Sequence, residues 1–209
     1  MILPHAIGSV SHIYGSTSWA SIVSDTELFV AFGGVPLKNG QIAQGGVGRH
    51  RQREAVVQAR EAGVDFVNIS PLRSDILEEL GADWFAPRPS TDTALMLGLT
   101  HTLVVEGLVD EEFLTRYCVG FDRFSRYLTG QADGVAKSAA WAASICDLTE
   151  ARILELARRM ARARTMISLS WSLTRQDHGE QTYWAGIALA AALGQIGPNV
   201  GDAAVAGLV

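Results

Sequence analysis

The stretch TMISLSWSLTRQDHGEQ, residues 165–181, indicates the fold, because a short apolar run passes directly into a polar turn. Thr165–Leu169 is predicted to be a buried strand, and the apolar residues 183–196 predict a buried helix after the turn. A connection that only reversed the chain would be shorter and richer in Gly, Pro and Asn. The Trp, Arg, Asp, His and Glu in this turn are typical of a ligand-binding loop on a rigid scaffold.

The same unit of apolar run, polar turn and helix occurs earlier in the chain. Strands are predicted at residues 27–32, 65–69 and 84–86, in addition to the one at 165–169. Helices are predicted between and after them, at residues 49–62, 74–80, 92–105, 149–163 and 178–195, with a helical stretch at 111–148. The side chains at 90–92 are expected to supply the N-cap of the helix at 92–105, and Thr149 that of the helix at 149–163. Strands that alternate with helices predict an α/β fold with a parallel sheet flanked by helices. In such folds, ligands bind beyond the carboxyl ends of the strands.

Composition excludes several classes of protein. The chain has 209 residues, 48% of them hydrophobic and 19% charged, which is enough for one large core. The net charge is −5 and no dense basic cluster is present, so no nucleic-acid partner is expected. The most apolar segment, residues 184–197, is shorter than the roughly 20 residues that span a membrane, so no span is expected. Cys118 and Cys146 give neither a metal-ligand spacing nor a disulfide framework. The first ten residues resemble no secretion signal, and the compartment, cytoplasmic or periplasmic, stays open.

Polar residues follow the first two predicted strands. In GGVPLKNGQ, residues 33–41, the glycines allow a close backbone approach, and Lys38 could meet a phosphate or a carbonyl. In SPLRSD, residues 70–75, Ser70 offers a hydroxyl, Pro71 restricts the turn, and Arg73 could bind a phosphate in a bidentate manner. Taken singly, a solvated surface loop and a helix-capping turn account for these two segments more simply.

Asp92 follows the third predicted strand, in the first turn of a helix. The helix dipole favours a carboxylate there, so helix capping is a sufficient explanation. The functional alternative is specific. A carboxylate accepts two parallel hydrogen bonds from the N1–H and N2–H₂ edge of guanine, a geometry that adenine does not supply.

The turn after the fourth predicted strand carries the richest chemistry. Trp171 could stack on a flat heterocycle, and Ser172 and Arg175 could hold a pterin or phosphate edge. His178 has no second His at zinc-ligand spacing, so we predict no metal site built from this chain's own residues. No Ser-His-Asp or Cys-His pair is predicted, and no catalytic residue is assigned. Together, the four turns predict a large, planar, phosphate-bearing ligand across the sheet edge.

Five segments of the sequence resemble one known family in the same order. They are PLKNGQI, ISPLRSD, RPSTDTALMLGLTHTLV, FLTRYCVGFDRFSRYLTGQADGVAKSAAWAASIC and SWSLTRQDHGEQTYWAGIALAAALGQIG. The family is the molybdenum oxidoreductases that reduce dimethyl sulfoxide, trimethylamine N-oxide, and biotin or methionine sulfoxide. The resemblance runs from about residue 3 to residue 197 and does not choose among these substrates.

The resemblance implies a fold and a cofactor. Residues 1–197 would be part of a Rossmann-like, doubly wound cofactor-binding region, with a helical insertion at 111–148, whereas residues 198–209 depart from the family pattern. In the full-length protein the cofactor would be molybdenum held by two molybdopterin guanine dinucleotides. The implied contacts are Lys38 and Gln41 near the cofactor, Ser70, Pro71 and Arg73 at a guanosine end, Asp92 on guanine, and Trp171, Ser172, Arg175 and His178 on the dinucleotide.

The sequence also departs from the family. Ser70 stands where the family usually has Asp, and Val35 where it often has Asp, so one nucleotide is expected to be held less tightly. The family's serine ligand to molybdenum would precede Met1. We therefore expect an internal piece of a larger bacterial enzyme, inactive alone, whose partners are its remaining domains, an S-oxide or N-oxide substrate and an electron donor protein. The alternatives are a non-catalytic guanine-nucleotide-binding module and a structural remnant without a ligand.

Overall fold

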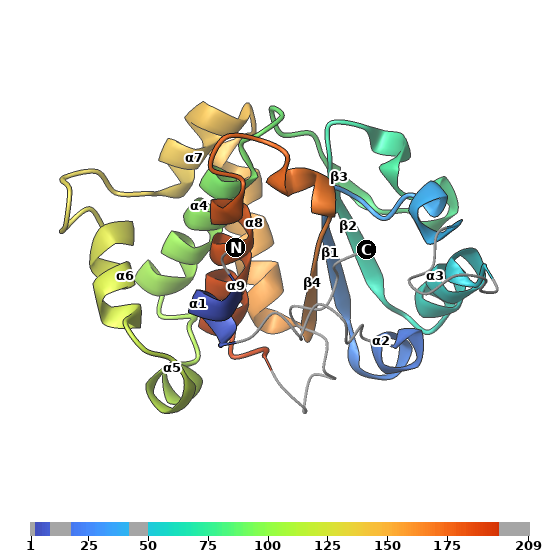
Figure 1. The fold of residues 1–209 in the computed structure, drawn as a ribbon, viewed down its shortest axis with the longest axis horizontal. Coiled ribbons are helices and arrows are strands. Elements are labelled where there is room, and N and C mark those ends of the chain that lie inside the picture. Colours follow the sequence, from blue (N-terminus) through green and yellow to red (C-terminus); the bar gives the residue numbers. More distant parts are fainter. Residues whose placement is uncertain (1–2, 9–17, 42–49, 197–209) are drawn as a thin grey trace.

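Four parallel strands form one sheet at the centre of the protein. The computed structural model describes residues 3–8, 18–41 and 50–196. Its strands are β1 (Leu28–Phe32), β2 (Asp65–Ile69), β3 (Asp83–Phe85) and β4 (Thr165–Leu169), in the order β3-β2-β1-β4 (Figure 1). β1 is a central strand, β2 and β3 follow it outward to one edge of the sheet, and β4 pairs with the other side of β1. This order confirms the predicted parallel α/β fold, with the third strand one residue earlier than predicted.

Helices cover both faces of the sheet (Figure 1). One face carries α4, α7, α8 and α9, and the other carries α2 and α3. The helix bounds are α1 (Leu3–Ile7), α2 (Trp19–Asp25), α3 (Gln52–Glu61), α4 (Asp92–Val105), α5 (Glu111–Tyr117), α6 (Phe121–Leu128), α7 (Ala139–Cys146), α8 (Glu150–Arg162) and α9 (Glu180–Ala192). Helices α5, α6 and α7 occupy the predicted helical insertion. Within the described ranges, no helix is both long and apolar enough to cross a bilayer.

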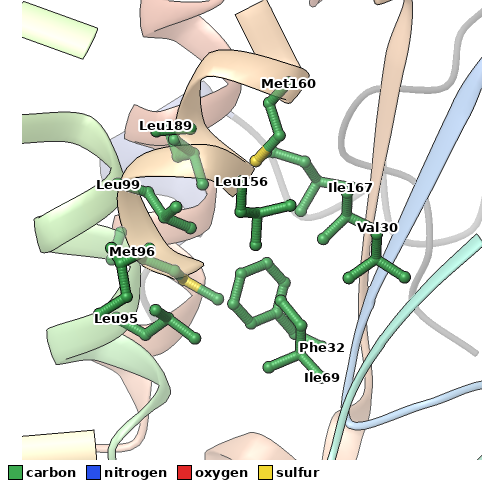
Figure 2. Close-up of a cluster of buried hydrophobic side chains, with 14 of the residues drawn as sticks. Val30, Phe32, Ile69, Leu95, Met96, Leu99, Leu156, Met160, Ile167 and Leu189 are labelled. Atoms are coloured by element: carbon green, nitrogen blue, oxygen red, sulfur yellow. The ribbon is translucent and has the colours of Figure 1, made fainter. Parts of the chain in front are cut away.

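Strands β1 and β4 are buried at every position and β2 at all but its first, and most of these residues are apolar because both faces of the sheet are covered there, whereas the edge strand β3 begins at exposed Asp83. Val30, Phe32 and Ile167 point into the larger core, where they meet Leu156 and Met96 of the covering helices (Figure 2). The residues between them on the strands point the other way and join the smaller core under α2 and α3; they are Phe29, Ala31, Phe66 and Met166. Two cores on opposite faces hold the sheet rigid, and this rigidity fixes where its polar turns lie.

The predicted helix at residues 74–80 is wrong. The chain forms two short 3-10 turns instead, η3 (Arg73–Asp75) and η4 (Glu78–Leu80), and the second ends at Gly81 in the left-handed conformation. The buried Asn68 side chain explains the difference, because its Nδ2 donates to the carbonyls of Leu72 and Arg73, at 3.3 Å each. The carbonyl of Leu72 also accepts from the N–H of Asp75 at 3.2 Å, which closes a 3-10 turn. A polar side chain that binds nearby carbonyls in this way favours a short turn over a continuous helix.

Other boundaries differ by smaller amounts. The expected N-cap of α4 is not made by a side chain, because the Thr91 hydroxyl donates to the carbonyl of Arg88 at 2.6 Å. The cap of α8 is confirmed, since the Thr149 side chain accepts from the backbone of Arg152. Helix α9 begins at Glu180, after the predicted start at His178. Residues 42–49 and the predicted divergent end, residues 198–209, lie outside the described residues.

Candidate functional site

The turns that follow the four strands line one cleft of about 220 Å³ at the carboxyl edge of the sheet. Five of the predicted site residues lie on its wall: Ser70, Pro71, Asp92, Ser172 and Arg175. The remaining lining residues are Gly33, Ile69, Asp75, Pro87, Arg88, Pro89, Ser90, Leu173 and Gln176. The parallel topology therefore brings together residues that are up to 143 positions apart in the sequence, from Gly33 to Gln176.

Backbone hydrogen bonds continue the sheet into the floor of the cleft. The N–H of Gly33 donates to the carbonyl of Ile69 at 2.8 Å, and the N–H of Ser170 donates to that of Phe32 at 2.9 Å. Gly33 has a φ of +82°, and a Cβ there would lie 2.5 Å from the Cβ of Ser170. Glycine is required because the turns after β1 and β4 touch at this point.

Asp92 is a buried carboxylate on the cleft wall. It is the first residue of α4 and is only 6% exposed. Burial raises its pKa from 3.8 to about 6, while a hydrogen bond from its own backbone N–H lowers the pKa. Among the described residues, no cation lies within ion-pair distance of it, and no other side chain hydrogen-bonds to it. The carboxylate oxygens are therefore free to accept hydrogen bonds from a ligand.

Ser70 lies deeper in the cleft and uses its hydroxyl within the protein. Its Oγ donates to Asp75 Oδ2 at 2.6 Å and accepts from the N–H of Leu72 at 3.2 Å, and the side chain is 1% exposed. The indole N–H of Trp84 donates to the Ser70 carbonyl at 2.8 Å. Ser70 thus holds the carboxylate of Asp75 beside the cleft.

Two arginines line the cleft, and they differ in their partners. The guanidinium of Arg88 binds both carboxylate oxygens of Asp147, with Nε at 2.9 Å and Nη2 at 2.7 Å. Arg175 follows the 3-10 turn η5 (Trp171–Thr174) and is exposed. It makes no ion pair within the described part of the chain. Arg175 is therefore the cation in the cleft that is available for a ligand phosphate.

Local hydrogen bonds hold the shape of the turn that follows β4. The Ser170 side chain accepts from the backbone N–H of Ser172 at 3.4 Å, and Gln176 Nε2 donates to the carbonyl of Leu173 at 2.8 Å. Trp171 is exposed and does not line the cleft. His178 is also exposed, has a φ of +54°, and lies 3.7 Å from Asp177. Trp171 and His178 thus remain predicted contacts outside the cleft wall.

Three more predicted residues lie outside the cleft wall. Lys38 and Gln41 are exposed on the 3-10 turn η2 (Leu37–Gln41) after β1. Arg73 is exposed on η3, with its guanidinium carbon 6.0 Å from the centroid of the Trp84 ring. These side chains could reach parts of a ligand that extend beyond the cleft, and their roles stay predictions.

Several residues that line the cleft carry no clear signal in the sequence. Arg88 lies between Pro87 and Pro89, and two prolines restrict the backbone on either side of it. Ser90 has a φ of +66°, which no sequence pattern here predicts for a residue other than glycine. Asp75 and Gln176 lie in turns and were not predicted as site residues. No group of three or more His, Cys, Asp or Glu that could hold a metal is found within the described residues.

The geometry suits a nucleotide-bearing group. Asp92 offers two acceptors to a base edge, Arg175 offers a cation to a phosphate, and the glycine at position 33 lets a ligand approach the backbone.

Comparison with known proteins shows the family of the chain. Residues 3–206 match the family "Molybdopterin oxidoreductase". The chain is 41% identical over 197 residues to a dimethyl sulfoxide/trimethylamine N-oxide reductase of Cereibacter sphaeroides, covering 94% of this chain and 24% of that protein. It is 38% identical to a trimethylamine-N-oxide reductase of Haemophilus influenzae, again covering 94% and 24%, and 39% identical to a biotin sulfoxide reductase of Cereibacter sphaeroides, covering 94% and 27%.

A solved structure shares the fold. Acetylene hydratase from Pelobacter acetylenicus superposes with a TM-score of 0.68 at 22% identity, over 93% of this chain and 25% of that one. The chain thus spans about a quarter of the length of the relatives it matches. With a family match over nearly its whole length and a buried carboxylate and a free arginine at the carboxyl edge of its sheet, the chain belongs to the molybdopterin oxidoreductase family.

Proposed function

We propose that this chain is the part of a molybdenum-dependent S-oxide or N-oxide reductase that binds a guanine dinucleotide end of the cofactor. The observation that carries the proposal is Asp92, a buried carboxylate on the cleft wall that has no partner cation in the described part of the chain. Keeping such a group buried costs free energy, and a ligand that donates two hydrogen bonds to it would offset that cost. The N1–H and N2–H₂ groups of guanine are such a pair of donors.

Each turn takes a part in this proposal. Asp92 reads the base, Ser70, Pro71 and Arg73 meet the guanosine, and Ser172 and Arg175 hold phosphate. Trp171 and His178 flank the nucleotide at the exposed rim, and Lys38 and Gln41 reach toward the pterin. Residues 1–197 would then be one cofactor-binding region, with 111–148 as its helical insertion.

The chain contributes binding and orientation to the reaction of the whole enzyme. When bound, the molybdenum cofactor supplies oxygen-atom transfer from an S-oxide or N-oxide and is re-reduced by an electron donor. The cleft residues hold one end of that cofactor at a rigid sheet edge, so that its other end is fixed relative to the substrate. The substrate, the electron donor protein and the remaining domains belong to this proposal for the whole protein.

Binding of guanosine monophosphate to the purified chain tests the base-reading role. We expect GMP to bind more tightly than inosine monophosphate, which lacks the N2 amino group, and AMP to bind more weakly still. Asp92→Asn should remove the preference for GMP over AMP, because an amide cannot accept both hydrogen bonds. The matched control is Asp122→Asn, an exposed carboxylate on α6. Equal affinity for GMP and AMP by calorimetry would contradict the proposal.

An activity assay tests whether the chain catalyses the reduction by itself. The purified chain, supplied with a reduced viologen dye and dimethyl sulfoxide, is expected to show no turnover. Binding of GMP by the chain without any molybdenum requirement, together with failure to bind the intact dinucleotide cofactor, would instead favour a guanine-nucleotide-binding module.

A further inference from the structure

The turn between β3 and α4 is fastened to the end of α7 by contacts on both backbone and side chains. The N–H of Arg88 donates to the carbonyl of Cys146 at 2.9 Å, and the Cys146 thiol donates to the carbonyl of Thr91 at 3.5 Å. The two-pronged pair of Arg88 with Asp147 adds to these contacts. The turn that carries Arg88 and leads into Asp92 is therefore held against α7.

Arg88 and Asp92 lie four residues apart and line the same cleft. Thr91 closes the turn between them by its 2.6 Å hydrogen bond to the Arg88 carbonyl. Burial raises the pKa of the nearby Cys146 thiol, and the charges of Asp92, Asp147 and Arg88 all act on it. Arg88 thus lines the same cleft as the carboxylate of Asp92, while its guanidinium pairs with the carboxylate of Asp147.

We propose that Asp147 is a positioning residue for nucleotide recognition: by binding the Arg88 guanidinium at two points, it keeps that cation from pairing with Asp92. The inference rests on the proposed reading of guanine by Asp92. An Arg88–Asp92 pair would occupy the acceptor oxygens that a base edge needs. Charge neutralisation would favour that pair, so the competing carboxylate is what leaves Asp92 open.

The backbone at position 147 suits this role. Asp147 follows α7 in the left-handed conformation, with a φ of +58°. Asp and Asn adopt this conformation more readily than other residues with side chains, so Asp147→Asn removes the charge while keeping the turn. The other charged groups that line the cleft are Asp75, held by Ser70, and Arg175.

The first test measures the carboxyl pKa of Asp92 by carbon NMR, without nucleotide. In Asp147→Asn the pKa should fall by about one to three pH units, because Arg88 is released to pair with Asp92. In Arg88→Gln/Asp147→Asn it should return to the wild-type value. An unchanged pKa in Asp147→Asn would overturn the proposal. The pKa measurement needs no ligand, so it tests the role of Asp147 even if GMP fails to bind the wild-type chain. Failure of GMP to bind would count against the proposed function alone.

The second test measures GMP binding in the same variants. Asp147→Asn should weaken binding about tenfold or more, since an occupied acceptor costs at least one charge-assisted hydrogen bond. Adding Arg88→Gln should restore the affinity, and Asp147→Glu should retain most of it. The matched control is Glu106→Gln, which breaks the similar two-pronged pair of Glu106 with Arg158 away from the cleft. A double variant that binds as poorly as Asp147→Asn would show a merely structural role and overturn the proposal.

Discussion

The Ser70 hydroxyl donates a 2.6 Å hydrogen bond to Asp75 Oδ2 across the turn that follows β2. This bond places the half-buried carboxylate of Asp75 beside the cleft, next to the buried hydroxyl of Ser70. The expected looser hold on one nucleotide stays a prediction.

Removal of the Ser70 hydroxyl should destabilise the turn. In Ser70→Ala, Asp75 loses a hydrogen-bond donor and the N–H of Leu72 loses an acceptor. We expect the free energy of unfolding to fall by about 1–2 kcal/mol, because Asp75 is only half-buried and water can replace part of the loss. Urea denaturation measures this change. The control is Ser74→Ala, an exposed neighbour in the same turn, which should change stability little.

Replacement of Ser70 by the family's usual residue should have a pH signature. In Ser70→Asp two carboxylates meet at hydrogen-bond distance, and the pair can hold one proton, so the pKa of one group rises. The native state then binds a proton that the unfolded chain releases. Stability should therefore fall as the pH rises from 5 to 8 in this variant, relative to wild type. A parallel pH dependence for the two proteins would contradict this expectation.

Asp92 should make the wild-type protein less stable as the pH rises. Its pKa is about 6 in the folded chain against an ordinary 3.8, so the native state holds a proton between these values that the unfolded state does not. Ionisation above pH 6 therefore costs ~3 kcal/mol of stability relative to pH below 3.8. Asp92→Asn should be more stable than wild type at pH 8, and the difference should shrink toward pH 4. Thermal or urea unfolding at both pH values measures the effect, with Asp122→Asn as control.

The same titration should govern binding of GMP. A protonated Asp92 loses an acceptor, so affinity should fall about tenfold per pH unit below pH 6 and level off above it. Calorimetry between pH 5 and pH 8 measures this dependence. AMP, which cannot use both oxygens, should show a flatter profile; equal slopes for the two nucleotides would count against recognition by Asp92.

Gly33 allows the turns after β1 and β4 to touch. In Gly33→Ala, the new Cβ would lie 2.5 Å from the Cβ of Ser170, at a φ of +82°. Gly107 has a φ of +65° but nothing within 4 Å of an added Cβ, so Gly107→Ala isolates the backbone cost. We expect Gly33→Ala to cost about 1–3 kcal/mol more than Gly107→Ala in urea denaturation, because of the close contact. Equal costs would show that the two turns can separate.

The strands and helices differ in how well sequence patterns predict them. The four strands were predicted to within a residue at their ends, because strands buried on both faces read as unbroken apolar runs. Helix α8 was predicted with its Thr149 cap, since both cap and apolar stripe are local. Helices α1 and α2 were not predicted, and the helix at 74–80 was wrong because its competitor, the Asn68 side chain, lies outside that segment.

The candidate site, like the fold, could be predicted from the sequence only in part. Residue types and their places after strands identified Ser70, Asp92 and Arg175 as candidates, because parallel topology alone sends strand ends to one edge. Which carboxylate is paired could not be predicted. That Arg88 binds Asp147, 59 positions away, while Asp92 stays without a cation depends on where α7 ends against the β3–α4 turn. The sequence by itself determined the sheet, its order of turns and the family; the tertiary structure decided which charges meet, because ion pairing depends on distance in space and not along the chain.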